Sequence, residues 1–378
     1  MESIISFLSP EQYYIIYILC VFFLCLITSL IMVNSSHNRI IVYTSSQFYG
    51  NLFLSFIIIL FIIVFLGYRS DKGFVDSLGY SIMYNSYENY VPINWEGEWL
   101  FVNFSYFCKE IGLSVSGYFL AIMIVYTSCM FLCSVILLQR NVWFATLIWL
   151  SSLSFYGYAT NGLRNGMACS IVILAITIIT KKELWKRIVA IILMVIAFGI
   201  HRSTLLPSLC CIAALFQSKT TKNAIFFWLA SIPVSFLLGN IFGDMFAGFG
   251  FNDRSAYLEN TEIIETSGMS LNTGFRWDFL LYSSMPVLMV WYLTIKRNFN
   301  DITYNIISNT YILANAFWII VIRSEYSNRF AYLSWFIYPL VIAYPLIRFN
   351  IWENQNRKAG IILLLYSGFT LFMNMVYK

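Results

Sequence analysis

Twelve apolar runs, separated by short polar connections, constrain this chain more than any other feature of its sequence. They cover residues 13–33, 48–67, 115–137, 141–157, 165–180, 186–200, 203–217, 224–242, 278–295, 303–322, 330–348 and 359–376. A helix that crosses a membrane needs about 20 apolar residues. Only 11% of the residues are charged, against roughly 25% in soluble domains. We therefore predict an all-α polytopic membrane protein with about twelve transmembrane helices, forming a single integral membrane domain over residues 1–378.

The charges in the connections predict how these helices are oriented. One alternating set of connections holds 13 basic and three acidic residues, whereas the other set holds ten basic and fifteen acidic residues. By the positive-inside rule the first set is cytoplasmic. Its basic residues are Arg39, Arg140, Lys181, Lys182, Lys186, Arg187, Lys219, Lys222, Lys296, Arg297, Arg348, Arg357 and Lys358. Both termini and two long connections, about 68–114 and 243–277, are then expected on the outer face, and each connection is expected to hold short amphipathic helices.

The basic residues of the outer face are mainly arginines, seven against three lysines. A guanidinium offers a rigid fork of donors that matches phosphate oxygens. Arg164 opens one apolar run and His201 closes the next, after a turn that contains Lys181 and Lys182. Two helices joined by a short turn return to the side they left, so Arg164 and His201 are expected at the same membrane face. A cation beside a titratable imidazole suggests a site for a lipid-linked anion.

Both residues also have a structural interpretation. In that interpretation Arg164 snorkels to the membrane interface, and His201 only ends its helix. The sequence alone leaves both interpretations open.

The connection 68–114 interleaves acidic residues with aromatic rings. Carbohydrate binding is one interpretation, because rings stack on the apolar faces of sugars and carboxylates accept hydrogen bonds from hydroxyl groups. An interfacial belt of aromatic residues with solvated acids is the other. Asp76 and Glu98 are the acids that we select as candidates for binding sugars.

Two later outer segments place an arginine directly before an apolar run. Arg276 stands two residues before Asp278, so the two residues either pair or Arg276 reaches a phosphate. Arg329 opens a helix as Arg164 does, with Tyr332 about one turn later. An ion pair between Glu325 and Arg329, four residues apart, is the alternative.

Other chemistries lack support in the sequence. There is no phosphate-binding glycine loop, Rossmann fingerprint or nucleophile elbow, and no basic surface interleaved with aromatic residues. Seven of the eight cysteines lie in apolar runs, where cysteine acts as a small hydrophobic residue. We therefore expect no metal site, no cofactor and no nucleic-acid partner.

Several segments resemble motifs of the EpsG-like family of membrane polysaccharide polymerases. The block 161–168 resembles the family's N-x-hydrophobic-R-Q-G-hydrophobic-A motif, with Asn165 where the family has Gln. The block 197–203 resembles a second signature, A-x-x-x-H-x-S, at the end of a span. Further matches fall in the first long connection and in a late segment, at Arg69, Asp76, Tyr80, Glu98, Asn328, Arg329, Phe330 and Tyr332.

The resemblance implies a repeat-unit polymerase for the O-antigen of lipopolysaccharide or for another exopolysaccharide. It implies a GT-C-like architecture in the bacterial inner membrane, with an active site that faces the periplasm. The substrates would be undecaprenyl-pyrophosphate-linked oligosaccharides, and the partners would be membrane lipid and a chain-length regulator protein.

This function, together with His201 and the outer arginines described above, suggests a mechanism. His201 is expected to act as a metal-independent general base, while Arg164 and Arg276 stabilise the pyrophosphate leaving group. The residues expected to bind substrate are Arg69, Asp76, Tyr80, Glu98, Arg329 and Tyr332. A flippase or transporter for the same lipid, an O-antigen ligase and an acyltransferase stay open as alternatives. Transporters usually place polar groups near the middle of the membrane, so ionisable residues gathered at one face favour an enzyme.

Overall fold

The computed structural model describes residues 8–35, 45–71, 74–87, 95, 97–247, 275–323 and 327–376. Within these ranges the regular elements are helices. The chain divides into two compact units. Unit 1 comprises Met1–His201 and Ala343–Lys378, and unit 2 comprises Arg202–Ile342. Each unit is described below by itself.

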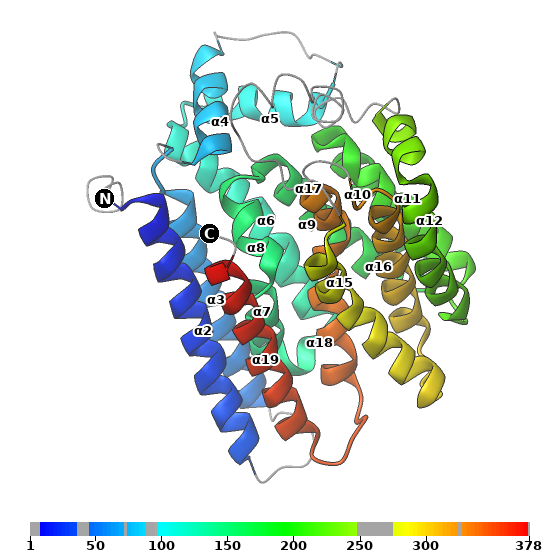
Figure 1. Cartoon of the computed structure of the whole chain (residues 1–378). Coiled ribbons are helices and arrows are strands. Elements are labelled where there is room, and N and C mark those ends of the chain that lie inside the picture. The colour runs from blue at the N-terminus through cyan, green and yellow to red at the C-terminus, as the bar shows by residue number, and fades with distance from the viewer. Residues whose placement is uncertain are drawn as a thin grey trace. The chain divides into compact units, whose positions relative to one another are not determined.

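Unit 1 combines long helices with several short ones, and two of the short helices, α4 and α5, lie at one end (Figure 1). Its helices are α2 (Pro10–Asn34), α3 (Ser45–Gly67), α4 (Val75–Ser86), α5 (Trp99–Glu110), α6 (Val115–Leu137), α7 (Val142–Leu150), α8 (Leu153–Thr160), α9 (Leu163–Ile179), α10 (Leu184–Ile200) and α19 (Gln355–Val376). The short helices α4 and α5 lie in the first long connection, as the sequence predicts. Helix α9 packs against α6, α8 and α10, and its buried face includes Gly166, Ala168 and Cys169.

Unit 2 is organised around α16. Its elements are the short helix Arg202–Thr204, α11 (Leu205–Phe216), α12 (Lys222–Ala247), α15 (Trp277–Val290), a π-helical turn (Trp291–Lys296), α16 (Ile302–Ile320) and α17 (Ser327–Trp335). Helix α16 packs against α11, α12, α15 and α17. Helix α18 (Tyr338–Arg348) begins in unit 2 and ends in unit 1.

The structure confirms a polytopic membrane protein. Six helical stretches of the described residues are long and apolar enough to cross a membrane. They are Pro10–Asn34, Phe48–Gly67, Val115–Leu137, Trp277–Lys296, Phe330–Arg348 and Gln355–Met375. Shorter helices also match predicted runs, and α9 and α10 have 17 residues each. At 1.5 Å per residue such a helix reaches about 26 Å, slightly less than the hydrocarbon core, so the number twelve stays a prediction.

One predicted run is divided in the structure. Residues 141–157 form α7 and α8, with a break at Ser151 and Ser152. Ser151 Oγ donates to the carbonyl of Leu147 at 2.6 Å, and bonds of this kind compete with the regular helical pattern. The apolar composition predicted one continuous span here, whereas the structure has two helices.

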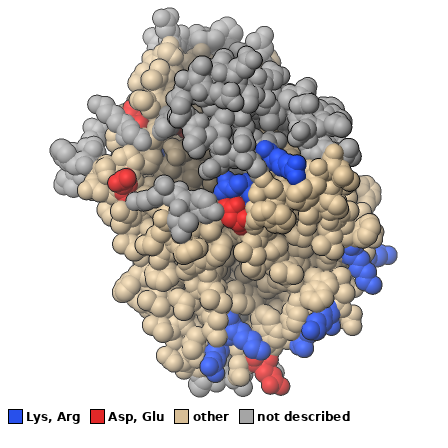
Figure 2. Space-filling model, viewed as in Figure 1, with Lys and Arg blue, Asp and Glu red and all other residues tan. Residues whose placement is uncertain are grey.

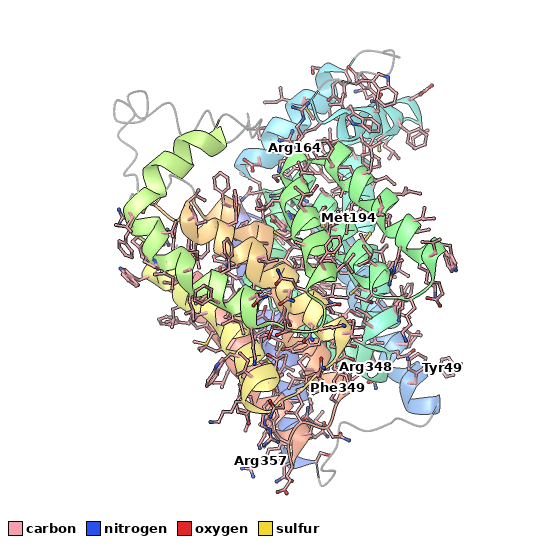
Figure 3. All side chains as sticks on the ribbon, turned by 90° about the vertical axis from the view of Figure 1, so that its right-hand side faces the viewer. Tyr49, Arg164, Met194, Arg348, Phe349 and Arg357 are labelled. Carbon is pink, nitrogen blue, oxygen red and sulfur yellow. The ribbon has the colours of Figure 1, made fainter. Side chains whose placement is uncertain are left out.

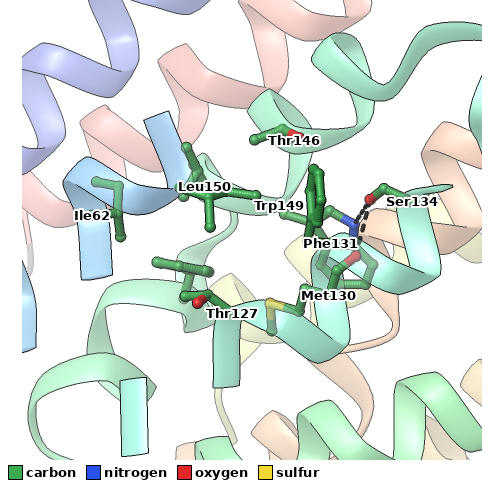
Figure 4. Close-up of a pocket in the computed structure, with 10 residues that line it drawn as sticks. Ile62, Thr127, Met130, Phe131, Ser134, Thr146, Trp149 and Leu150 are labelled. Atoms are coloured by element: carbon green, nitrogen blue, oxygen red, sulfur yellow. Dashed lines mark hydrogen bonds between the residues drawn. The ribbon is translucent and has the colours of Figure 1, made fainter. Parts of the chain in front are cut away.

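The contact between α3, α6, α7 and α8 is tightly packed (Figure 4). Trp149 Nε1 donates to Ser134 Oγ at 3.1 Å across it. The remaining gap has a volume of about 10 Å³, which is about what one water molecule needs. This part of unit 1 is therefore a packed core with no room for a substrate.

Opposite ends of unit 1 carry different residues. Arg164 lies at one end, whereas Arg348 and Arg357, both assigned to the cytoplasmic set, lie at the other (Figure 3). Figure 2 shows that charged side chains on the drawn face lie mostly at helix ends, and that the surface along the helices is almost entirely uncharged. Long uncharged helix faces with charged ends are what a lipid environment requires.

Candidate functional site

Three ionisable residues meet at one end of unit 1. Glu98 Oε2 forms an ion pair with Arg164 Nη1, and Glu98 Oε1 contacts His201 Nδ1. The side chains of Glu98 and His201 are 11% and 9% exposed, while that of Arg164 is 27% exposed. Arg164 is therefore the member of this Glu98–Arg164–His201 cluster that is most accessible from outside. The prediction that Arg164 and His201 lie at the same end is confirmed.

The backbone conformation directly before α5 positions Glu98 in this cluster. Gly97 has a φ of 61°, a left-handed conformation that side chains disfavour. Glu98 then occupies the N-cap position of α5, where its carbonyl accepts from Phe101 N at 3.0 Å. Its side chain forms no cap hydrogen bond. The carboxylate is therefore directed to Arg164 and His201 instead of to its own helix.

A glycine lets α5 approach the end of α10. A Cβ atom on Gly199 would lie 3.0 Å from the ring of Trp99 and 3.1 Å from Cβ of Leu100. Any larger side chain would push α5 away. Gly199 stands two residues before His201 and Trp99 directly follows Glu98, so this contact sets the distance between the imidazole and the carboxylate.

Helix ends hold the other two members of the cluster. His201 is the C-cap residue of α10, and its N–H donates to the carbonyl of Ala197 at 2.9 Å. Arg164 is the second residue of α9. A cation at a helix N-terminus faces the positive end of the helix dipole, which an anion offsets. Glu98 supplies that anion.

The cluster has a definite hydrogen-bonding polarity. An ionised carboxylate only accepts hydrogen bonds, so a proton on Nδ1 of His201 would face Glu98. In a neutral imidazole that carries its proton on Nδ1, Nε2 is the basic nitrogen. Arg164 and Glu98 form the ion pair of the cluster, and a proton on His201 would add one positive charge to it.

Two tyrosines and an aspartate of α4 and its end lie near Arg164. Burial raises the pKa of Tyr80. Arg164 partly offsets this rise, because its guanidinium is positively charged and its backbone N–H donates to the phenol oxygen. Asp76 is close enough to act on Tyr80 electrostatically. Burial also raises the pKa of Tyr87 to about 12, again with Arg164 as an opposing influence. Both phenols therefore stay protonated at neutral pH and can donate hydrogen bonds beside the cluster.

Arg69 lies apart from this surface, inside the protein. It is 1% exposed. Its Nη1 donates to the carbonyl of Leu66 at 2.5 Å, and its Nη2 donates to Ser77 Oγ at 2.8 Å and to the carbonyl of Thr160 at 3.2 Å. The Phe119 ring centroid is 4.8 Å from the guanidinium carbon. Arg69 thus connects the end of α3, α4 and the end of α8, just before the turn that leads to Arg164.

Arg276 belongs to unit 2 and is paired. Its Nε and Nη2 donate to the two carboxylate oxygens of Asp278 at 3.0 and 2.7 Å. Its guanidinium carbon lies 3.7 Å from the Phe279 ring centroid. The sequence left open whether Arg276 pairs with Asp278 or reaches a phosphate, and the structure shows the pair. The side chain is 21% exposed.

Aromatic rings connect Arg276 to a second arginine of unit 2. Phe275, its neighbour in sequence, stacks on Phe236 with centroids 4.6 Å apart. The guanidinium carbon of Arg323 lies 4.7 Å from the Phe236 ring centroid. Two of the arginines that the sequence assigns to the outer face therefore share one aromatic cluster.

The segment that contains Glu325, Arg329 and Tyr332 is described only in part. Glu325 and the side chain of Arg329 lie outside the described residues, as does most of the connection 243–277. Tyr332 is half-buried and its ring centroid is 5.4 Å from that of Trp335. The predicted roles of Arg329 and Tyr332 stay predictions.

The sequence did not indicate every residue that shapes this site. Glu98 was selected as a sugar-binding acid, without its contacts to Arg164 and His201. Ser77 and Thr160, which hold Arg69, carried no signal, because a serine and a backbone carbonyl are common everywhere. Gly199 lies inside the matched block 197–203, but its contact with Trp99 depends on folding over a long distance in sequence.

Comparison with known proteins identifies one family. The chain matches the EpsG family over residues 52–378. This range includes all of unit 2, unit 1 from residue 52 onward, and every residue of the Glu98–Arg164–His201 cluster. Neither the curated proteins nor the solved structures gave a match.

Proposed function

Because this chain belongs to the EpsG family of polysaccharide polymerases, we propose that it joins undecaprenyl-pyrophosphate-linked oligosaccharide repeat units into a longer glycan. The product is an O-antigen or another exopolysaccharide. The observation that carries this proposal is the Glu98–Arg164–His201 cluster, which combines an oriented imidazole with an accessible guanidinium at one end of unit 1. Such a pair suits a hydroxyl nucleophile and a phosphate leaving group.

The proposed reaction forms one glycosidic bond and breaks one bond to phosphate. A hydroxyl oxygen of the acceptor unit attacks the anomeric carbon of the donor glycan. The bond from that carbon to the pyrophosphate oxygen breaks, and its electron pair leaves with the undecaprenyl pyrophosphate. His201 Nε2 takes the hydroxyl proton, and the carboxylate of Glu98 stabilises the resulting imidazolium.

Arg164 is proposed to stabilise the leaving group. Negative charge builds on the pyrophosphate as the bond breaks, and a fixed guanidinium lowers the energy of that state. Arg276 and Arg329 are proposed for the same purpose, Arg276 by exchanging Asp278 for phosphate. Asp76, Tyr80 and Tyr332 are proposed to bind sugars. Glu98 gains a positioning role through His201, and Arg69 is proposed to support the turn that carries Arg164.

The proposal includes a location. We place the protein in the bacterial inner membrane with about twelve spans, a GT-C-like architecture and the Glu98–Arg164–His201 cluster at the periplasmic face. The positive-inside rule supports this orientation, because the turn between α9 and α10, which contains Lys181 and Lys182, lies at the other end of these helices. A chain-length regulator is proposed as a partner.

The glycan profile of a deletion strain tests this function. The strain is complemented with the wild-type gene, with His201→Ala and with Arg164→Ala, and lipid-linked and surface glycans are separated by size. We expect a ladder of chain lengths only with the wild type and a single repeat unit with either variant. If repeat units instead accumulate on the cytoplasmic side of the membrane, the protein is a flippase and the proposed reaction is wrong.

A further inference from the structure

A polar cavity lies in unit 2, beyond the end of α15 that is opposite to Arg276. Its volume is about 290 Å³, close to the lower end of the range of small-molecule sites, which starts at about 300 Å³. Its lining includes Lys219, Thr220 and Thr221, which directly precede α12, and Lys222, which begins it. Thr294 lines it from the π-helical turn. The positive-inside rule assigns this end of unit 2 to the cytoplasm.

The charges around this cavity favour an anion. Lys219 and Lys222 are both exposed. At the start of α12, Lys222 N donates to Thr220 Oγ1 at 3.2 Å and Ile225 N donates to the carbonyl of Thr221 at 3.0 Å. The two N–H groups between them have no carbonyl partner within their own helix and add positive potential. The nearest acid in sequence to the lining residues, Asp301, caps α16, and its Oδ1 accepts from Tyr304 N at 2.7 Å.

The buried side-chain amide of Asn305 has an oxygen that can accept a further hydrogen bond. Asn305 lines the cavity and is 2% exposed. Its Nδ2 donates to the carbonyl of Ser218 at 3.0 Å and to Asn300 Oδ1 at 3.1 Å. Its Oδ1 has no hydrogen-bond partner among the described residues. Buried acceptors are normally satisfied, so a fitting ligand brings a hydroxyl group as well as an anion.

Apolar side chains surround the same end of the unit. Phe226 and Phe227, about one turn beyond Lys222, are 74% and 47% exposed, and Trp291 at the start of the π-helical turn is 43% exposed. In a membrane protein such side chains contact acyl chains and the interface. The ligand therefore has apolar chains beside its polar part.

We propose that this cavity binds the headgroup of an anionic glycerophospholipid. The phosphate diester would accept from Lys219, Lys222 and the start of α12. A headgroup hydroxyl would donate to Asn305 Oδ1 after this buried side chain turns toward the cavity. The bound headgroup would then join α12 to the π-helical turn, where Thr221 Oγ1 and Thr294 Oγ1 are already 2.7 Å apart.

Lipid binding to the purified full chain tests this proposal without reference to polymerase activity. Native mass spectrometry in a neutral detergent would measure the affinity for phosphatidylglycerol and for zwitterionic phosphatidylcholine. Each lysine near a membrane surface contributes roughly a fivefold change in affinity for anionic lipid, so Lys219→Gln with Lys222→Gln should weaken phosphatidylglycerol binding by about thirtyfold. Lys181→Gln with Lys182→Gln removes the same charge from unit 1 and should leave the affinity unchanged.

The outcomes separate the possible ligands. Preference for phosphatidylglycerol that is lost only in the cavity variant supports the site. Equal binding by the cavity variant and the wild type overturns it. Displacement of the lipid by millimolar inorganic phosphate would assign the cavity to a free phosphate and overturn the lipid assignment. Size-exclusion chromatography verifies folding, and the single variants Lys219→Gln and Lys222→Gln replace the double variant if it does not fold.

Discussion

At the scale of single residues, Glu98 is the centre of the proposed mechanism. Glu98→Gln keeps the shape of the side chain and removes its charge, so an imidazolium at His201 loses its counter-ion. We expect the polymerisation rate to fall roughly 10²–10⁴-fold. The acid limb of the pH–rate profile should also move to lower pH, because His201 then takes up a proton less readily. Rates measured across pH with purified enzyme check both effects.

The control for this variant is Glu110→Gln, which changes an exposed carboxylate at the other end of α5. It should leave the rate and the pH profile unchanged. A uniform loss of rate in Glu98→Gln, with the profile in place, would reduce Glu98 to a purely structural residue.

Arg164 tests the importance of guanidinium geometry. Arg164→Lys keeps a positive charge, but a point charge cannot reproduce the two-pronged contact with phosphate oxygens. We expect a loss of roughly 10²–10³-fold in the rate, typical of removing one donor that stabilises a transition state. Arg187→Lys, at the other end of unit 1, provides the matched control. Full activity of Arg164→Lys would leave Arg164 as an interfacial residue.

Arg69 tests a structural role against a role in substrate binding. Lysine cannot make the contacts to Leu66, Ser77 and Thr160 together, and a buried polar group left without its partner costs about 1–3 kcal/mol. Arg69→Lys should lower the free energy of unfolding by about that amount, as thermal unfolding in detergent would reveal. An unchanged stability together with a raised KM would show instead that Arg69 binds substrate.

At the scale of elements, the approach of α5 to α10 controls the cluster. Gly199→Val would place side-chain atoms against the Trp99 ring and shift α5, taking Glu98 away from His201. Overpacking of this kind typically costs 1–3 kcal/mol, and we expect activity to be lost as well. Gly79→Val in α4 is the control, since a Cβ atom there has no neighbour within 4 Å. Equal effects of the two substitutions on activity would remove the α5–α10 contact from the account.

Some helices agree with the apolar runs predicted from the sequence, and others differ from them. The run 115–137 coincides with α6, and the run 186–200 begins two residues inside α10, because continuous apolar composition marks buried or lipid-facing helices. The break between α7 and α8 was not predicted, since two serines barely change the hydropathy. The common end of Arg164 and His201 follows from the turn between two helices. The contact of both with Glu98 does not, because it depends on packing between segments about 65 and 100 residues apart in sequence.

At the scale of the whole molecule, the orientation in the membrane is the main prediction. Glu110→Cys at the end of α5 should react with a membrane-impermeant thiol reagent added to spheroplasts. Lys182→Cys, in the turn between α9 and α10, should react only after the membrane is permeabilised. Native cysteines are all free and mostly buried, and the wild type measures their background labelling. The reverse pattern would place the Glu98–Arg164–His201 cluster on the cytoplasmic side and contradict the proposed location.

The most direct test of the central claim is polymerisation by the purified protein. It would be reconstituted in liposomes with undecaprenyl-pyrophosphate-linked repeat units, and mass spectrometry would measure chain length and released lipid pyrophosphate. We predict a ladder of chains with one lipid pyrophosphate released for each bond formed. A folded His201→Ala protein should give neither product. Single repeat units that remain unjoined with active wild-type protein, or a ladder of normal length with His201→Ala, would contradict the account.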